Sequence, residues 1–495
     1  MGSGKDTGWY NWTVPDPVRP DDHRRADRHP LPVPRRRFLE RSAYAVAGGA
    51  LFACTGGRVI RKVDDPTPQI ETRWPIKRVV YLMLENRSFN NLFGRFPGAT
   101  GTRVGVSDGR EVRLARCPDW LPGDIPHDRA AHLLHTNGGA MDGFASGRYG
   151  DPWAYTQFTE EQVPVYWHWA REYALSDRFF ASVGGPSYPN HFFFVAGQSG
   201  GTIDNPENIK VRRDGNRVIK SWGCDAEGED VFVFVKDDEG NLTKHDTCFT
   251  FETVGEQLTD IGVDWAYYSA PPGITGYFWN AYNGIADVFH TDLWHEHIRS
   301  TERTEDSPGL IADIEAERLP AVTWVTPRFE LSDHPPASTS FSHNWVAKVV
   351  HALMRSPMWD HTAIFLTWDE WGGFYDPVVP PEFDDLGLGV RVPLLTISPY
   401  ARRGIIDDEV GEFSTPLRFI SDNWGLEPLT PRIRRAHNFE HVFDFSKPPR
   451  APEIITAKAA TYGTFREHPE SFPEWPAGTI AIEDQPDGGP PWPGG

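Results

Sequence analysis

The chain has 495 residues, enough to bury a large core, and it carries 49 Lys and Arg against 69 Asp and Glu. This acidic balance, without any basic stripe, argues against a nucleic-acid partner. The length alone would allow two or three domains, but α/β enzymes often use such a length as one decorated domain. We therefore expect one catalytic domain with insertions.

A basic cluster before a short apolar stretch marks the N-terminal part. Arg35-Arg36-Arg37-Phe38-Leu39 precedes a weakly apolar run from Ser42 to Cys54. This order is typical of a secretory signal, and the arginines with Phe and Leu resemble a twin-arginine signal. We expect residues 1–34 to be an extension, 35–54 an export signal and 55–75 a linker.

The end of the same stretch, Leu51-Phe52-Ala53-Cys54, resembles a lipoprotein cleavage site. Cys54 is therefore a candidate for a lipid anchor. The apolar stretch is too short for an ordinary transmembrane helix, so we expect no membrane span. The alternative interpretation of the whole segment is a chance basic cluster before a short buried helix.

Two apolar runs, far apart in the sequence, end in acidic or amide residues. Val79–Leu84 leads into Glu85-Asn86, and Ala363–Trp368 leads into Asp369-Glu370. Such runs predict strands buried on both faces, as in parallel sheets covered by helices. Ligands bind beyond the carboxyl ends of these strands. Three carboxylates and one amide at that edge predict a site for a divalent cation.

Further strands and helices alternate along the chain. An amphipathic helix is predicted at Asn344–Met354, where apolar residues recur at spacings of three and four. Buried strands are predicted at Val263–Ser269, Ala321–Thr326 and Leu394–Ser398. The alternation predicts an α/β fold with a doubly wound, mostly parallel sheet flanked by helices. Residues 76–450 should form the catalytic domain, and the Pro-, Gly- and acid-rich residues 451–495 an irregular tail.

Two cysteines bracket a predicted β-hairpin insertion. Val231–Val235 has the pattern of a strand, and Asp237–Asn241 supplies turn residues before the chain returns to Cys248. A disulfide between Cys224 and Cys248 would suit an exported protein. Cys117 is left over as a buried thiol, and no Cys/His spacing indicates a zinc finger.

A turn rich in Gly and Pro presents a serine between the two acid-bearing strands. Gly184-Gly185-Pro186 precedes Ser187, and Pro189 follows it, which fixes a tight turn with an exposed hydroxyl. A cation lowers the pKa of a bound alcohol and makes it a nucleophile. We predict that Ser187 is the nucleophile. The alternative is a turn serine that caps a helix starting near Asn190.

Six motifs follow one another along the chain: Glu85–Phe89, Asp124–His127, Asn137–Phe144, Gly185–Asn190, Ser332–Pro336 and Trp368–Asp376. In this order they resemble the bacterial phospholipase C and acid phosphatase family of phosphoesterases, within the alkaline-phosphatase superfamily. The similarity extends from about Arg78 to Pro448, which is most of the chain. It implies an alkaline-phosphatase-like fold and hydrolysis of phosphate esters.

The resemblance also implies a metal site and a nucleophile. In that family the counterparts of Glu85, Asn86, Asp369 and Glu370 hold a divalent metal ion. The serine or threonine of the Gly-Pro-Ser/Thr turn, here Ser187, becomes transiently phosphorylated.

Histidines near the family's site bind phosphate oxygens or protonate the leaving group. His127 and His334 lie in matching motifs and are the candidates for these roles. His191 and His343 are reserve candidates for binding phosphate. Asn190 is placed with them, because it would cap the next helix, whose N-terminus favours an anion.

The chain departs from the family's motifs at three places. Asn90-Asn91 and Asp376-Pro377 stand where many relatives have Asp-His, and Trp371 stands where some have histidine. We therefore expect one metal site, and the missing imidazoles put a second in question.

Together these features predict an exported, metal-dependent phosphoric-ester hydrolase with a serine nucleophile. A phosphatase of broad specificity is favoured, because no all-β lipid-binding module follows the catalytic region. The alternative is a phospholipase C that acts on phospholipids, and a more remote one is an inactive surface protein that binds partners through its aromatic residues. A glycosidase is disfavoured, because the adjacent Asp369 and Glu370 would point to opposite faces of a strand.

Overall fold

The computed structural model describes residues 71–456 except 216, 227–229 and 238. The predicted export signal, the candidate anchor at Cys54 and residues 457–495 of the predicted tail lie outside this part of the chain. Within it, no helix combines the length and the apolar character that crossing a bilayer requires.

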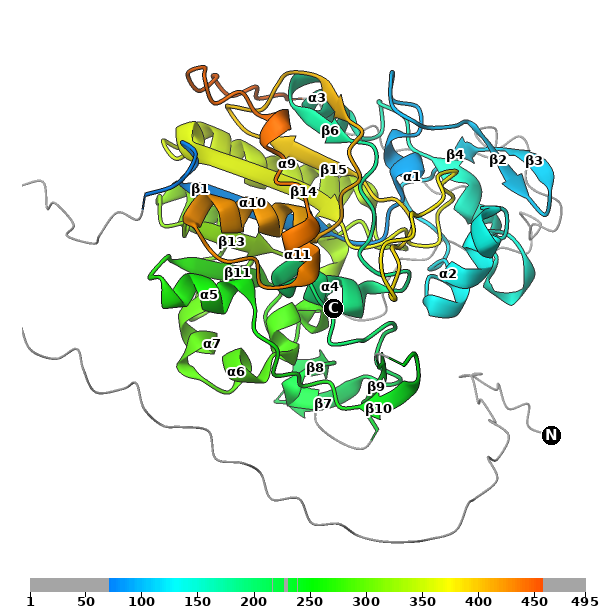
Figure 1. Cartoon of the computed structure of the whole chain (residues 1–495), viewed down its shortest axis with the longest axis horizontal. Helices are drawn as coiled ribbons and strands as arrows, with labels where there is room; N and C mark the ends of the chain where they lie inside the picture. The colour runs from blue at the N-terminus through cyan, green and yellow to red at the C-terminus, as the bar shows by residue number, and fades with distance from the viewer. Residues whose placement is uncertain (1–70, 216, 227–229, 238, 457–495) are drawn as a thin grey trace, which may run out of the picture. The chain divides into compact units, whose positions relative to one another are not determined.

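A mixed sheet of eight strands forms the centre of the fold (Figure 1). Its spatial order is β12 (Ile298–Ser300), β11 (Trp265–Ser269), β13 (Val322–Val325), β1 (Arg78–Leu84), β14 (Thr362–Trp368), β15 (Leu394–Ile397), β6 (Ala174–Ser176) and β16 (Ile405–Asp407). β15 runs antiparallel to both of its neighbours, and all other pairs are parallel. The predicted doubly wound, mostly parallel sheet is confirmed.

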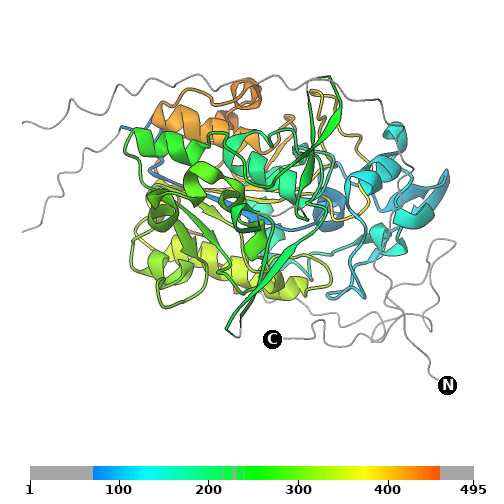
Figure 2. The ribbon, with the colours of Figure 1, turned by 90° about the horizontal axis from the view of Figure 1, so that it is seen from below.

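Helices cover both faces of this sheet. Figure 2 shows the sheet nearly edge-on, with the orange helix α10 (Ser414–Trp424) on one side and the yellow-green α9 (Thr339–Arg355) on the other. α9 contains the predicted helix and buries Val346, Val350 and Leu353, which recur at its helical period. The remaining helices are α1 (Phe89–Phe93), α2 (Arg129–Thr136), α3 (Pro164–Glu172), α4 (Ser187–Ala196), α5 (Val254–Asp260), α6 (Ala286–Phe289), α7 (Asp292–His297), α8 (Leu310–Glu315) and α11 (Pro431–Arg435).

The register of the two central strands decides where their acidic ends lie. Leu84 at the end of β1 pairs with Trp368 at the end of β14. The N–H of Asp369 then donates to the carbonyl of Leu84 (2.9 Å), so Glu85 and Asp369 leave the sheet side by side. Apolar burial over both strands therefore fixes the position of two carboxylates.

Short two-stranded pairs are separate from the main sheet, and most of them are antiparallel. The predicted hairpin is confirmed as β9 (Val233–Lys236) with β10 (Leu242–His245), and its first strand begins two residues later than expected. Further small pairs are β2 (Val104–Ser107) with β3 (Arg110–Arg113), β4 (Ala115–Arg116) with β5 (Thr156–Gln157), and β7 (Lys210–Asp214) with β8 (Arg217–Ser221).

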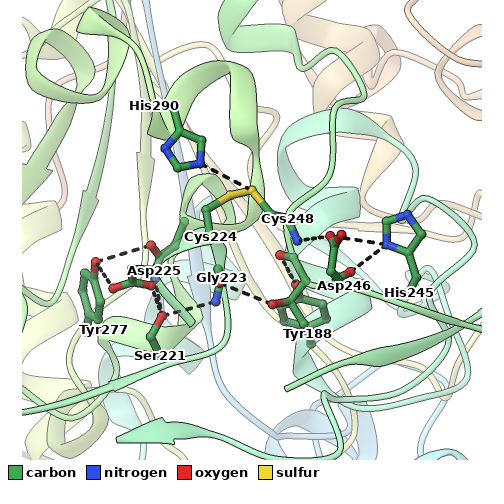
Figure 3. The surroundings of a disulfide bond; sticks show 12 residues. Tyr188, Ser221, Gly223, Cys224, Asp225, His245, Asp246, Cys248, Tyr277 and His290 are labelled. Carbon is green, nitrogen blue, oxygen red and sulfur yellow. Dashed lines mark hydrogen bonds and ion pairs between the residues drawn. A yellow bond between two sulfur atoms is a disulfide. The ribbon is translucent and has the colours of Figure 1, made fainter. Parts of the chain in front are cut away.

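The predicted disulfide between Cys224 and Cys248 is confirmed, and Cys117 is a buried free thiol. Figure 3 shows that the bridge lies close to the start of α4. The carbonyl of Thr247, next to Cys248, accepts a hydrogen bond from the hydroxyl of Tyr188 (3.0 Å). The disulfide therefore anchors a segment that holds the residue directly after Ser187.

Replacing both Cys224 and Cys248 by Ser should lower the free energy of unfolding by on the order of 3 kcal/mol, because the bridge restricts the unfolded chain over a separation of 24 residues. Equilibrium unfolding in denaturant measures this difference. A reductant should destabilise the parent chain and leave the double variant unchanged. An equal effect of the reductant on both proteins would contradict this explanation.

Candidate active site

A side chain on α4 holds the turn that presents Ser187. The amide nitrogen of Asn190 donates to the carbonyls of Val183, Gly185 and Pro186 (3.3, 3.1 and 3.0 Å), and its oxygen accepts from the N–H of Val183 (3.0 Å). Asn190 is fully buried, and these bonds engage both ends of its amide. The prediction that Asn190 caps the helix and binds phosphate is wrong, because α4 already begins at Ser187 and the amide stabilises the preceding turn.

Ser187 is the first residue of α4, and its hydroxyl points to an acid rather than to its own helix. Its Oγ donates to Glu85 Oε2 at 3.1 Å. One helical turn later, His191 places its Nε2 2.8 Å from Glu85 Oε1 and 3.9 Å from Asp369 Oδ2. Residues four apart share one face of a helix, so α4 directs both side chains at the same acidic cluster.

All four of the predicted metal ligands lie in this buried cluster. The N–H of Asn86 donates to Asp369 Oδ1 (2.8 Å), which ties the end of β1 to the end of β14. Three oxygens are buried without a hydrogen-bond partner among the described residues: Asn86 Oδ1, Asp369 Oδ2 and Glu370 Oε1. Unpaired buried oxygens are costly, and a hard divalent cation would satisfy them. The residues therefore fit a metal ion.

The turn after β14 brings Glu370 into place and requires glycine. Gly372 has a φ of +60°, and a Cβ there would lie 2.4 Å from the carbonyl oxygen of Asn86. The N–H of Gly372 donates to Glu370 Oε2 (2.7 Å), which leaves Oε1 for another partner. The strand has ended at Trp368, so the alternation of a β-strand no longer separates Asp369 from Glu370.

Burial sets the protonation of the cluster. It raises the pKa of Glu85 to about 8, and it raises the pKa values of Asp369 and Glu370 well above their usual range. The charge of Glu85 adds to the effect at Asp369, and the charge of Asp369 adds to it at Glu370. A bound dication would oppose both effects, because it favours the ionised carboxylates.

His191 belongs with this cluster rather than with the phosphate. One ligand atom from each of Glu85, His191 and Asp369 can be chosen so that all lie within 4.8 Å of one another. Burial lowers the pKa of His191 to about 4, which keeps the imidazole neutral, as a metal ligand must be. We therefore replace its predicted role in binding phosphate by that of a candidate metal ligand.

His127 and His334 lie next to each other at the margin of the cluster, with ring centroids 5.7 Å apart. Nδ1 of His127 contacts the carbonyl of Ile125 (2.6 Å), and because a carbonyl only accepts, Nδ1 carries the proton. Its Nε2 then accepts from Asn86 Nδ2 (3.2 Å) and lies 3.9 Å from Glu370 Oε1. His334 likewise donates its Nδ1 proton to the carbonyl of Pro335 (2.5 Å), which leaves Nε2 as an acceptor.

His343 contacts helix α3 rather than the acidic cluster. On α9, its Nε2 accepts the N–H of Val165 (3.1 Å), and its ring packs against Tyr166, both on α3. The side chain is fully buried. The prediction that it binds phosphate is wrong, because this imidazole joins two helices.

Structural contacts also account for two of the places where the chain departs from the motifs that it resembles. Asp376 forms an ion pair with Arg391 (3.1 Å) in which both side chains are fully buried, and it accepts the N–H of Asn90 (3.0 Å). The indole of Trp371 donates to His135 Nδ1 (3.1 Å). Both departures are therefore held in place by buried polar contacts.

Two supporting residues were not predicted. Arg87 is buried, donates to the carbonyl of Asp333 (2.7 Å) and to Thr339 Oγ1 (2.9 Å), and lies over the ring of Phe374. The Asp333 carboxylate accepts from the indole of Trp368 (3.0 Å), the residue directly before Asp369. Both lie inside motifs already noted in the sequence, and that position was the available signal.

In the presence of a chelator, the free energy of unfolding should fall as the pH rises from about 4.5 to about 8. The folded state then holds a proton on Glu85 that the unfolded chain has lost, and this costs up to about 1.4 kcal/mol per pH unit for one such carboxyl. Denaturant unfolding across this range measures the slope. Glu85→Gln should flatten it, whereas Glu330→Gln at a partly exposed ion pair should not; an equal slope in all three proteins would refute the assignment.

Residues 76–427 match the model of the Phosphoesterase family. Hemolytic phospholipase C of Pseudomonas aeruginosa is 25% identical over 479 residues, which cover 83% of this chain and 62% of that protein. Phospholipase C B of Mycobacterium tuberculosis is 25% identical over 489 residues (85% and 88% of the two chains). Non-specific phospholipase C6 of Arabidopsis thaliana is 25% identical over 447 residues (78% and 76%).

Solved structures resemble the chain more distantly. A protein in the alkaline phosphatase superfamily from Vibrio parahaemolyticus has a TM-score of 0.35 and 11% identity, with 78% of this chain and 75% of that chain covered. The fold assignment rests instead on the strand order of the sheet. The family match spans every residue of the acidic cluster, the turn before α4 and both marginal histidines, and the chain belongs to the Phosphoesterase family.

Proposed function

We propose that this chain is a metal-dependent hydrolase of phosphoric esters in which Ser187 is the nucleophile. The observation that carries the proposal is the hydrogen bond from Ser187 Oγ to Glu85 within a buried group of acids. Membership of the Phosphoesterase family supports hydrolysis of phosphoester bonds. The unpaired oxygens of the cluster argue against an inactive binding protein, because such a protein would gain nothing from burying them.

One divalent cation would be held by Glu85, Asn86, Asp369 and Glu370, with His191 as a further ligand. When bound, it supplies positive charge that lowers the pKa of a nearby alcohol and offsets the charge of the phosphoryl group. The ring nitrogens of His127 and His334 also come within 4.8 Å of the Asp124 carboxylate. We assign these histidines to the substrate, so the proposal keeps a single metal ion.

Hydrolysis would proceed in two steps. Ser187 Oγ forms a bond to phosphorus, its proton passes to Glu85 Oε2, and the bond from phosphorus to the leaving alcohol breaks. His127 supplies the proton for that alcohol from Nε2 after this nitrogen has taken a proton from solvent, and it returns to the neutral ring whose Nε2 faces Asn86 and Glu370. Burial lowers the pKa of His334 to about 4, so this neutral imidazole serves as a hydrogen-bond partner rather than an acid. Water then cleaves the phosphoserine and restores the Ser187 hydroxyl.

The helix that begins at Ser187 assists both steps. α4 is ten residues long, and its N-terminus carries partial positive charge. A phosphoryl group attached to Ser187 would sit at this end, where the helix dipole favours an anion, although the N–H of Tyr188 is bonded to Asn205 (3.0 Å) and Pro189 has no N–H.

Phospholipid-type phosphodiesters are the first choice of substrate, and phosphomonoesters the second. The sequence had favoured a phosphatase, but the relatives reported above are all named phospholipases C. Export through a twin-arginine route belongs to the same proposal and is supported by the disulfide, because such bonds form in oxidising compartments.

The full chain should hydrolyse an aryl phosphocholine faster than an aryl phosphomonoester, and a chelator should abolish both activities. Ser187→Ala should lower kcat by about 10³-fold or more, because the nucleophile is gone. Ser199→Ala, a buried serine just beyond the same helix, is the matched control and should retain activity. Retained turnover in Ser187→Ala would rule out this nucleophile, and a preference for the monoester would reverse the order of substrates.

Asp369→Asn should lose one equivalent of bound divalent metal, because it removes a charge from the ligand set. Elemental analysis after gel filtration measures the content. Asp292→Asn, at an exposed position on α7, should bind as much metal as the parent chain. Unchanged metal content in Asp369→Asn would remove this residue from the proposed ligands.

A further inference from the structure

A second group of metal-binding side chains lies at the edge of the sheet. Glu409, His437 and His441 each bring a ligand atom within 4.8 Å of the other two. They adjoin β16, and three strands separate β16 from β1 in the sheet. With neighbouring strands about 4.8 Å apart, the two ends are separated by roughly 19 Å. This group is therefore distinct from the acidic cluster at Ser187.

A carboxylate fixes the tautomer of His441. Its Nε2 lies 2.7 Å from Asp407 Oδ1, and because a carboxylate only accepts, Nε2 carries the proton. In the neutral ring, Nδ1 is then unprotonated, and its lone pair can bind a metal ion. This nitrogen lies 4.0 Å from Glu409 Oε1. A carboxylate behind an imidazole is the arrangement that orients histidine ligands in metal sites.

His437 has no hydrogen bond to satisfy its ring. Both of its nitrogens are buried and lack a hydrogen-bond partner within the described part of the chain. Nδ1 lies 3.7 Å from Glu409 Oε2. Burial lowers the pKa of His437, which favours the neutral ring that binds metals. The Glu409 carboxylate thus stands between two imidazoles whose Nδ1 atoms face it from different sides.

We propose that Glu409, His437 and His441 form a binding site for a transition-metal dication such as Zn²⁺, with Asp407 as the residue that orients His441. Two imidazoles and one carboxylate favour Zn²⁺ over Mg²⁺ or Ca²⁺, which prefer oxygen ligands. The four-residue spacing of the histidines lets both rings reach one ion from the short segment after α11.

The ion would fasten that segment to the sheet. Phe439, between the two histidines, is fully buried and stacks on Phe365 of β14 (5.7 Å). In the sequence, His437 and His441 lie on either side of Phe439, and Glu409 follows β16. Binding would therefore stabilise the contact between the C-terminal part of the domain and its edge strand.

Titration of the full chain with Zn²⁺, followed by calorimetry, tests the site. His437→Gln combined with His441→Gln should remove one Zn²⁺ equivalent or weaken it by about 100-fold, and Asp407→Asn should weaken it by about 10-fold. His295→Gln, at an exposed histidine on α7, is the matched control and should leave binding unchanged. The equivalent lost in Asp369→Asn should be a different one, so a chain that combines Asp369→Asn with His437→Gln and His441→Gln should lose both.

Two results would overturn the proposal: the double variant binding as much Zn²⁺ as the parent with equal affinity, or Mg²⁺ displacing Zn²⁺ from this site at similar concentration. If the double variant does not fold, Glu409→Gln, at an exposed position, provides the same measurement. Zn²⁺ should also raise the unfolding temperature of the parent more than that of these variants, and an equal rise in all of them would count against the site.

Discussion

The enforced closeness of Glu85 and Asp369 is the constraint on which the rest of the structure depends. The register of β1 on β14 places the two strand ends side by side, and the apolar burial of both strands holds that register. The same burial removes the water that would otherwise stabilise the two charges. His191, held neutral, cannot balance them. Folding of the core therefore leaves the two carboxylates without a compensating positive charge, which a dication would supply. This links the stability of the sheet to the chemistry at its edge.

The chain places its own positive charge behind the cluster rather than within it. Arg87 donates to the backbone carbonyl of Asp333, whose carboxylate in turn accepts from the indole of Trp368. This network fixes the two strand ends from behind without neutralising their carboxylates. A guanidinium placed among the acids would offset part of their charge and would compete with the proposed metal ion. The arrangement keeps the site rigid and still electron-rich.

The fold could be predicted because its central strands allow one interpretation: runs such as Val79–Leu84 and Ala363–Trp368 are apolar throughout and end in acids. The proposed acidic ligands followed from those ends. The roles of the polar residues did not follow from the sequence. An amide such as Asn190 can hydrogen-bond either to the backbone of the turn before it or to a ligand, and the backbone geometry that decides between them cannot be read from the sequence. His343 was different: it lies three residues before Val346 and seven before Val350, on the buried face of α9, so helical periodicity already indicated a residue of the core.

The two candidate metal sites lie at the same edge of the sheet but offer different kinds of ligand. β16 is parallel to β6. β15 lies between β6 and β14 and is antiparallel to both, so β6 and β14 run in the same direction. Asp407 therefore ends its strand at the same edge of the sheet as Leu84 and Trp368. At the centre of that edge the proposed ligands are mainly oxygens, joined by the imidazole of His191, and all are buried. At its margin the proposed ligands are two imidazoles and one carboxylate, and Glu409 and His441 are exposed or nearly so. With both proposed ions bound, the type of ligand would separate a hard ion at the acidic cluster from a softer one beside β16, so one sheet edge would hold two different metals.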